Sequence, residues 1–282
     1  YIDFLLAPQK LSIDDKNKII QYAGNNPLFL KSFVDYLKLN IDFQNSPKEL
    51  LTSIISSINV ENKLEIVNLL INKLAEKNSL SMKIFLLLKF FCGNVKEFVL
   101  QNILKISLMD IPSELVESDI IFIGKNEIKT SHLIYQEIID ACLYASYSNI
   151  KILINDILSK VESYELDHEK LLELKFRLYE ADNNAEDMIH TGLSLGKYKY
   201  SHGQYSTCAK YIDKCLCMID RIYANEDYCI LQVQLLEYAI NVEFYAKDNL
   251  GKTEMYIQQL EEILNDPSDE LVEQQIFCEL YT

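Results

Sequence analysis

The sequence contains no tryptophan and few of the residues that interrupt helices, with seven glycines and five prolines among 282 residues. Glycine and proline are the least favourable residues inside a helix, so their scarcity predicts a mostly helical protein. The chain is 49% hydrophobic and 24% charged, a balance typical of globular rather than disordered proteins. Its length favours two or three modules over a single core.

The sequence also lacks an apolar run that could cross a bilayer. Its most hydrophobic stretch, Ile84 to Cys92, has nine residues and includes Lys89, whereas a spanning helix needs about 20. No membrane association is therefore expected. The chain starts with Tyr1 rather than methionine and has no recognisable signal peptide, so we expect it to be a piece of a longer protein.

The sequence lacks the residue spacings that are typical of metal sites and disulfide frameworks. The four histidines are scattered, and the seven cysteines show no C-x-x-C spacing. The cysteines fall mostly on apolar faces of expected helices, at positions 92, 142, 208, 215, 217, 229 and 278. We interpret them as buried, reduced thiols, which implies a reducing compartment and hence a cytoplasmic location.

The net charge of −15 argues against nucleic acid as a direct partner, because an acidic protein repels a polyphosphate and no local basic patch is recognisable. Catalytic patterns are also missing. There is no GxxxxGK(S/T) phosphate loop, no Asp-bearing strand for Mg²⁺, and no Ser–His–Asp or Cys–His arrangement. The chain holds no complete active site, so whether it belongs to an enzyme stays open.

The residues from Ala23 to Leu30, Ala-Gly-Asn-Asn-Pro-Leu-Phe-Leu, predict a helix end, a tight turn and a new helix. Gly24 suits the left-handed conformation at a helix C-cap, and Pro27 suits the first helical turn. Such a turn is either a plain helix–helix connection or a place where backbone approaches a ligand, because Gly24 has no Cβ.

The first 76 residues otherwise read as one short strand and several helices. The apolar run 2–6 resembles a buried strand of a parallel sheet without partner strands in this chain. Ser12 is the expected N-cap of a helix that ends near residue 22. Further helices are expected over 27–39, 48–58 and 62–76. Core positions are expected at helical spacing, at Leu30, Phe33, Val34, Leu37, Leu64, Val67, Leu70, Ile71 and Leu74.

Residues 79 to 145 predict a winged helix, in which three helices precede a small hairpin. The helices are expected over 81–91, 96–106 and 112–117, and the hairpin strands over 120–123 and 127–130. A winged helix is often a DNA reader, but the short third helix carries two acidic residues and no basic one. We therefore expect a structural role.

The next helix, expected from Ser131 to about residue 147, places His132 at its N-terminus, with Ser131 as the N-cap candidate. A histidine there is either an ordinary surface or core residue, or a donor to a phosphate group. The residues alone leave both open.

From residue 149 onward the sequence predicts paired antiparallel helices with short turns. Their expected ranges are 150–164, 168–181, 185–202, 205–222, 227–247 and 250–265, followed by a last helix from 268. Gly196, Gly203, Tyr205, Cys208, Ile212 and Cys215 match tetratricopeptide spacing, and a weaker copy about 45 residues later places Ile257 and Leu260. The 18 tyrosines suit a packing and recognition surface.

Several segments together resemble the STAND group of AAA-related signal-transduction ATPases. The Ala23–Leu30 octet resembles the "GGNPLFL" signature of the lid, although Asn25 replaces the second glycine. The segment Thr-Ser-His-Leu-Ile-Tyr-Gln-Glu-Ile-Ile-Asp at 130–140 resembles the "FSHDLIREVVY" segment that closes the winged helix, with Thr130 and Leu133 as departures. The stretch 178–193 resembles the first superhelix helices of LuxR-type regulators and cyclase-associated ATPases.

The resemblance implies roles for four residues. Gly24, Asn26 and Pro27 would lie against the adenine of bound nucleotide. His132, in the place of the "MHD" histidine, would contact the β-phosphate of ADP and hold the resting state. ATP or ADP would be bound together with Mg²⁺ by a phosphate-loop core upstream of this chain.

We thus expect a mainly α protein with three domains: the end of an ATPase core and helical lid at 1–76, a winged helix at 77–147, and an α-solenoid of irregular tetratricopeptide-like helix pairs at 148–282. The expected function is the regulatory and sensor portion of a nucleotide-dependent switch. A protein or small-molecule signal would bind the repeats, and the chain could form homo-oligomers. The alternative is a non-enzymatic tetratricopeptide scaffold for protein–protein interaction.

Overall fold

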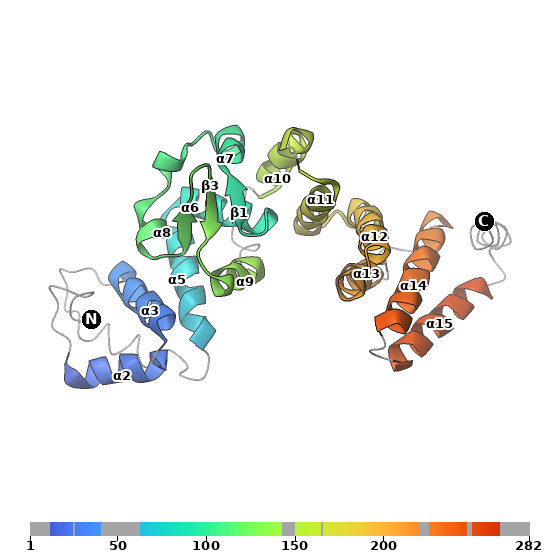
Figure 1. The fold of residues 1–282 in the computed structure, drawn as a ribbon, viewed down its shortest axis with the longest axis horizontal. Helices are drawn as coiled ribbons and strands as arrows, with labels where there is room; N and C mark the ends of the chain where they lie inside the picture. Colours follow the sequence, from blue (N-terminus) through green and yellow to red (C-terminus); the bar gives the residue numbers. More distant parts are fainter. Residues whose placement is uncertain are drawn as a thin grey trace. The chain divides into compact units, whose positions relative to one another are not determined.

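The computed structural model describes residues 12–24, 26–40, 63–142, 150–164, 166–219, 226–246 and 250–265. Within them the protein is mainly α-helical, as the composition predicts (Figure 1). The chain divides into two compact units, Tyr1–Ile150 and Lys151–Thr282, each described by itself below. The strand expected at 2–6, the helix at 48–58 and the last helix from 268 lie outside the described residues.

The first unit combines helices with a small sheet. In chain order its elements are α2 (Ile13–Ala23), α3 (Pro27–Asn40), α5 (Lys63–Lys77), α6 (Ser79–Phe90), β1 (Asn94–Lys96), α7 (Glu97–Ile103), the 3₁₀ helix η1 (Leu108–Asp110), α8 (Ser113–Glu117), β2 (Ile121–Ile123), β3 (Glu127–Thr130) and α9 (Leu133–Cys142). Helix α5 packs against α3, α6 and α9, and it therefore joins the N-terminal helices to the elements around the sheet.

The apolar faces of α3 and α5 form the core between these two helices. Phe33, Val34 and Leu37 are buried as predicted, whereas Leu30 is only half-buried and Phe29 is buried. On α5 the prediction is wrong for Leu64, which is 45% exposed. The other predicted positions on this helix are buried, together with Ile66, because the buried face begins two residues after Leu64.

The elements from α6 to β3 follow the winged-helix arrangement. Strand β3 lies between β1 and β2 and pairs antiparallel with both. The expected hairpin is present as β2 and β3. Strand β1 was not predicted, although Val95 pairs with Ile128 of β3 and both side chains are fully buried.

The helix expected over 96–106 is shorter than predicted and begins later. Lys96 belongs to β1, and α7 covers Glu97–Ile103. Pairing of 94–96 with β3 takes these residues out of the helix, and Lys105 has a positive φ of 59°, which ends it. Gly93 makes the turn before β1, and a Cβ there would meet Thr130 Oγ1 at 2.7 Å.

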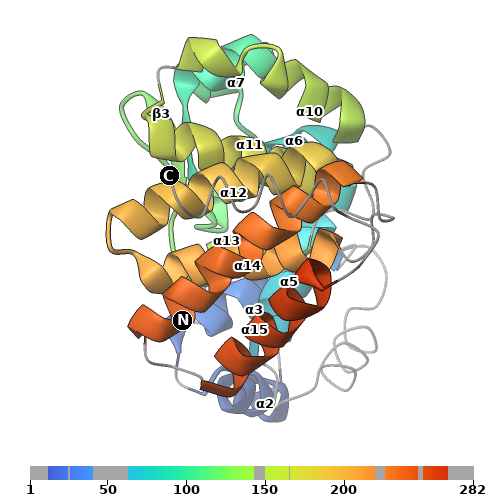
Figure 2. The same cartoon turned by 90° about the vertical axis from the view of Figure 1, so that its right-hand side faces the viewer.

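The second unit contains only helices among its described residues: α10 (Ile150–Leu158), the 3₁₀ helix η2 (Val161–Tyr164), α11 (His168–Asp182), α12 (Ala185–Ser201), α13 (Tyr205–Ile219), α14 (Glu226–Ala246) and α15 (Leu250–Leu264). The single helix expected over 150–164 is wrong, because α10 ends at Leu158 and a turn precedes η2. From α11 to α15 each helix packs against the next one, which gives the solenoid-like succession seen in Figure 2.

Two glycines allow α12 and α13 to approach closely. A Cβ on Gly192 would collide with Cys215 Sγ and would meet Phe176 Cε2 at 2.8 Å, and one on Gly196 would meet Ile212 Cδ1 at 2.6 Å. The predicted crossing at Gly196 is therefore present, and Gly192 extends it by one turn. Gly203 has a φ of 71° in the turn after α12, where glycine is favoured.

Candidate functional site

The turn between α2 and α3 has the geometry that its sequence predicts. Gly24 is the C-cap of α2, with φ 57° and ψ 36°, and its N–H bonds to the Ile20 and Gln21 carbonyls at 3.0 and 3.2 Å. The Asn26 Oδ1 accepts the Leu28 N–H at 2.9 Å, and α3 begins at Pro27. A ligand contact from Asn26 would come from its amide nitrogen or from the second lone pair of this oxygen.

Gly24 and Pro27 are both exposed, so the turn offers a glycine backbone and an apolar proline ring at the surface. This surface is compatible with a flat apolar ligand, and it is equally what a plain helix–helix connection presents. The predicted contact with adenine stays a prediction.

His132, rather than Ser131, caps helix α9. Its carbonyl accepts the N–H groups of Tyr135 and Gln136 at 3.1 and 3.3 Å, and its Nδ1 accepts the Ile134 N–H at 3.2 Å. Ser131 lies one residue before this cap, and its hydroxyl donates to the Asp119 carbonyl. The expected N-cap is thus displaced by one residue.

This arrangement fixes which nitrogen of His132 can act on a ligand. A ring nitrogen that accepts an N–H carries no proton, so the proton of the neutral ring lies on Nε2. The imidazole is exposed at the N-terminus of α9, where backbone N–H groups and the helix dipole favour an anion. His132 can therefore donate one hydrogen bond to an approaching phosphate oxygen.

Two polar contacts connect α3 with the segment around His132. The hydroxyl groups of Ser32 and Tyr135 lie 3.2 Å apart in the interior. Burial raises the pKa of the Tyr135 phenol, which therefore stays protonated in this bond at neutral pH. The Lys31 ammonium lies 3.6 Å from Asp119 Oδ2 and donates to the Glu117 carbonyl.

Sequence reasoning identified the turn and His132 but missed these connecting residues. Within the described residues no hydrogen bond or ion pair joins His132 directly to Gly24, Asn26 or Pro27. No local signal could have paired Ser32 with Tyr135, since 103 residues separate them. The packing of α3 and α9 in the folded unit brings these two residues together, and the spacing of residues in the sequence does not predict it.

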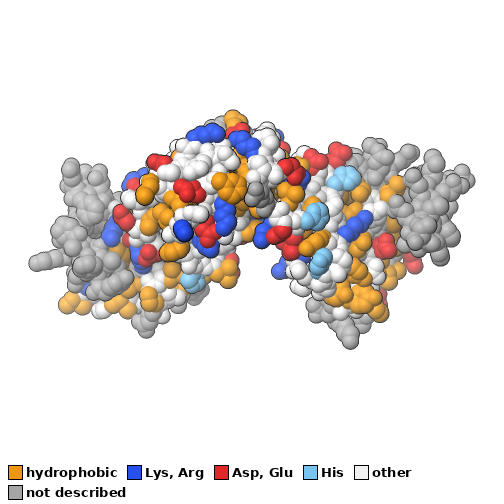
Figure 3. Space-filling model, turned by 45° about the horizontal axis from the view of Figure 1, so that its top comes forward, with side chains coloured by type: hydrophobic (Ala, Val, Ile, Leu, Met, Phe, Trp, Pro, Cys, Tyr) orange, Lys and Arg blue, Asp and Glu red, His pale blue; other side chains and the backbone are white. Residues whose placement is uncertain are grey.

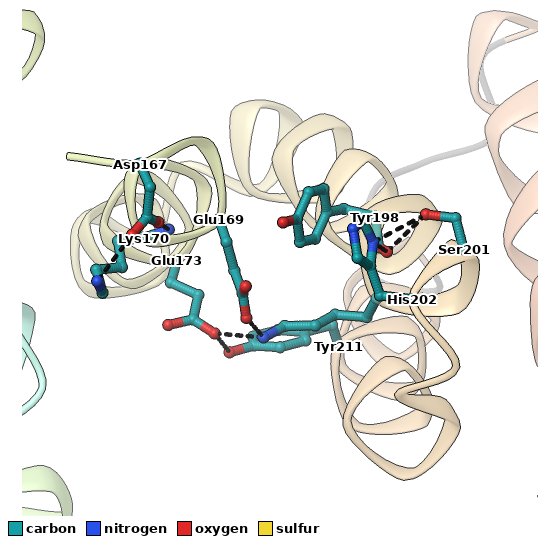
Figure 4. A network of polar contacts seen from close by, with 9 residues as sticks. Asp167, Glu169, Lys170, Glu173, Tyr198, Ser201, His202 and Tyr211 are labelled. Atoms are coloured by element: carbon teal, nitrogen blue, oxygen red, sulfur yellow. Dashed lines mark hydrogen bonds and ion pairs between the residues drawn. The ribbon is translucent and has the colours of Figure 1, made fainter.

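In the second unit a buried lysine joins the first repeats. Lys199 of α12 has a side chain only 4% exposed, contacts Glu169, and lies 2.9 Å from Glu173 Oε1, both on α11. Glu173 also accepts the Tyr211 hydroxyl of α13 at 3.4 Å (Figure 4). Burial lowers the pKa of Lys199, but the two carboxylates outweigh it and raise the pKa above its ordinary value. The cluster is a satisfied ionic network that holds three helices together.

A similar network lies further along the solenoid. Lys252 bonds Asp213 at 2.6 Å and lies 3.5 Å from Glu243, and the Tyr256 hydroxyl donates to Asp213 at 2.7 Å. Burial and the neighbouring Asp213 raise the pKa of Tyr256 to about 12. These groups satisfy one another across α13, α14 and α15, which favours a structural role over catalysis.

The histidines of the repeats are also engaged in packing. The His202 ring stacks on Tyr198 at 4.1 Å, and its Nδ1 lies 2.8 Å from the Tyr198 carbonyl oxygen (Figure 4). His168 approaches the same tyrosine edge-on at 5.7 Å. Nothing in this arrangement activates a nucleophile.

A cluster of aromatic rings on α12, α13 and α14 reaches the surface of the second unit. Tyr200 meets Tyr205, Tyr238 and Tyr245 with centroids 5.4, 5.5 and 6.1 Å apart. Tyr245 is 53% exposed and its neighbour Phe244 is 71% exposed. On the face in view in Figure 3, hydrophobic side chains of this unit lie among charged ones. Exposed aromatic clusters of this kind are typical of recognition surfaces.

No protein-family model, curated protein or solved structure matches this chain. Among the residues that the structure describes, no helix is both long and apolar enough to cross a membrane. Within the same ranges, no group of three or more His, Cys, Asp or Glu side chains is placed to hold a metal ion.

Proposed function

We propose that this chain is the regulatory and sensor portion of a STAND-type signal-transduction ATPase, in which Gly24, Asn26, Pro27 and His132 contact bound ADP or ATP. The lid and winged helix form one half of a nucleotide clamp. An upstream ATPase core supplies the other half, with its phosphate loop and Mg²⁺. The protein acts in the cytoplasm, and the ATP-bound form assembles into homo-oligomers.

The geometry of His132 is the observation that carries the proposal. Its Nδ1 is used in capping α9, which leaves the Nε2 proton at an exposed helix N-terminus. In the proposed resting state His132 donates to the β-phosphate of ADP, while the Gly24–Pro27 turn lies against adenine.

The second unit acts as the sensor in this proposal. Of the 42 acidic and 27 basic side chains of the chain, 25 and 12 lie in residues 151–282. This surplus of acid, together with the exposed Tyr245 and Phe244, favours a protein signal over nucleic acid. Signal binding and nucleotide binding then bias the same two-state equilibrium, so that the signal loosens the clamp and permits exchange for ATP.

A scaffold without nucleotide is the second candidate, and the same aromatic cluster favours it. The two candidates differ in one measurable respect, because only the switch couples partner binding to ADP.

Titration of the full-length protein, with the proposed upstream core, with a fluorescent ADP analogue tests the proposal. We expect saturable binding that His132→Ala weakens about ten- to a hundredfold, since one hydrogen bond to a charged group contributes about 1.5–3 kcal/mol. His190→Ala, an exposed histidine on α12, is the matched control and should bind as the unaltered protein does. Equal affinity in the two variants, or no binding at all, would contradict the proposal. The switch also predicts that His132→Ala raises basal output.

A further inference from the structure

Lys31 of α3 contacts the segment 117–119, within the half of the proposed clamp that this chain supplies. It lies four residues after Pro27, about 6 Å along α3 from the turn. Its side chain is 20% exposed, and its ammonium lies 2.9 Å from Asp35 Oδ2 on the same helix and 3.6 Å from Asp119 Oδ2. It also donates to the Glu117 carbonyl. One cation thus joins α3 to the segment between α8 and β2.

Asp119 continues this connection to His132. Its backbone has φ 55°, the left-handed region that few residues other than glycine occupy, and its N–H bonds the Val116 carbonyl at 3.0 Å. Its carboxylate faces Lys31, while its carbonyl accepts the hydroxyl of Ser131, the residue before His132. Asp119 therefore contacts Lys31 through its carboxylate and Ser131 through its backbone carbonyl.

A second contact runs parallel to the first one. Ser32, the neighbour of Lys31, meets Tyr135, whose N–H bonds the His132 carbonyl. The two links start from adjacent residues of α3 and end on either side of His132. Asp35 and Asp119 both add to the effect of burial in raising the pKa of Tyr135, which places these carboxylates near the same phenol. Loss of Lys31 would remove the cation that faces Asp119, whereas Asp35 would keep Lys38 at 3.7 Å.

We propose that Lys31 is a positioning residue that acts through Asp119 and Ser131 to fix the orientation of the His132 imidazole. In the proposed function, on which this step rests, the contacts of Lys31, Asp119 and Ser131 make the Gly24–Pro27 turn and His132 respond to nucleotide as one unit. A shift of α3 moves Lys31, and Lys31 moves the turn from which His132 projects. The structure offers a matched control on the same helix, since Lys38 also approaches Asp35, at 3.7 Å, but makes no described contact with the segment 117–131.

The first test reads the imidazole itself, with no nucleotide present. Long-range ¹H–¹⁵N spectra of the folded protein report the tautomer of each of the four histidines, and His132→Ala assigns the signal. We expect Lys31→Met to shift the His132 signals toward a mixture of tautomers, Lys31→Arg to restore them, and Lys38→Met to leave them unchanged. Unchanged His132 signals in Lys31→Met would overturn the inference.

Asp119→Asn gives a second route if Lys31→Met does not fold. Asparagine tolerates the left-handed conformation and keeps the carbonyl that Ser131 contacts, so only the charge facing Lys31 is lost. We expect Asp119→Asn, like Lys31→Met, to shift the His132 signals toward a mixture of tautomers. Wild-type signals in Asp119→Asn, with the fold intact by circular dichroism, would likewise overturn the inference.

A dissociation measurement separates this inference from the proposed function. In the full-length protein with the proposed upstream core, we expect a fluorescent ADP analogue to leave Lys31→Met about three- to tenfold faster than Lys38→Met, the range typical of residues that transmit coupling. Binding to the unaltered protein with equal rates in both variants would overturn the coupling alone. No binding to the unaltered protein would overturn the proposed function, while the imidazole spectra would still decide the role of Lys31.

Discussion

The hydroxyl groups of Ser32 and Tyr135 lie 3.2 Å apart in the interior of the first unit, although 103 residues separate them in the sequence. Ser32 lies on α3, one turn and a half after Pro27, and Tyr135 lies one turn after His132 on α9. Both side chains are fully buried. The contact therefore joins the helix that follows the Gly24–Pro27 turn to the helix that His132 caps.

Removing this bond should destabilise the first unit measurably. We expect Tyr135→Phe to lower the free energy of unfolding by about 1–2 kcal/mol, because the Ser32 hydroxyl stays buried without its partner. Ser32→Ala should cost a similar amount. Urea denaturation of both variants and of the double variant gives the coupling energy, which should be about 0.5–1.5 kcal/mol. Purely additive effects would show that the two hydroxyl groups do not interact.

The ion pairs that Lys199 and Lys170 form with acidic residues at α11 should differ in their contribution to stability. Lys199→Met leaves Glu169 and Glu173 without their cation, and we expect a loss of about 1–3 kcal/mol, moderated because both carboxylates are partly exposed. Lys170→Met removes a pair with Asp167 in which both side chains are more than half exposed, and it should change stability far less than Lys199→Met does. Thermal unfolding of the two variants checks this order. Equal losses would contradict the network as described.

The close approach of α12 and α13 depends on Gly192. Alanine there would place a Cβ against Cys215 and Phe176, and we expect Gly192→Ala to destabilise by about 1–2 kcal/mol despite the better helix propensity of alanine. Ser194→Ala, at an exposed site on the same helix, is the control and should lie within about 0.5 kcal/mol of the unaltered protein. A Gly192→Ala variant that is more stable would mean that the two helices lie further apart.

The cysteines of α13 should differ sharply in reactivity. Burial raises the pKa of Cys208 to about 11 and that of Cys215 to about 12, so both remain neutral thiols at pH 7–8. Cys217 is exposed. In the native protein we expect iodoacetamide to modify Cys217, and to reach Cys208 and Cys215 only after denaturation, as peptide mass mapping can establish. Equal modification of all three in the native state would contradict the described packing.

Much of the helical fold could be predicted because its signals are local. Ser12 caps α2, Gly24 ends it in the left-handed conformation, and α3 begins at Pro27, each as backbone chemistry requires. The prediction that the cysteines are buried is wrong for Cys92 and Cys217, which are exposed. Cys92 lies in the turn after α6, and Cys217 lies on the face of α13 that does not meet the core.

The features that sequence reasoning missed depend on contacts between distant segments. Strand β1 is three residues long, and only its pairing with β3 distinguishes it from the start of a helix. Ser131 was the expected cap, but its hydroxyl donates to the carbonyl of Asp119, twelve residues earlier in the chain, and His132 caps the helix. The division of the first unit into lid and winged helix, and the roles of Gly24, Asn26, Pro27 and His132, stay predictions.

The nucleotide content of the purified protein tests the central claim most directly. The full-length protein, with the proposed upstream core, would be isolated without added nucleotide and denatured, and the supernatant analysed by ion-pair chromatography and mass spectrometry. We predict close to one ADP per chain for the unaltered protein and for His190→Ala, and substantially less for His132→Ala. A protein that releases no ADP, or a His132→Ala variant that retains the full amount, would contradict the account.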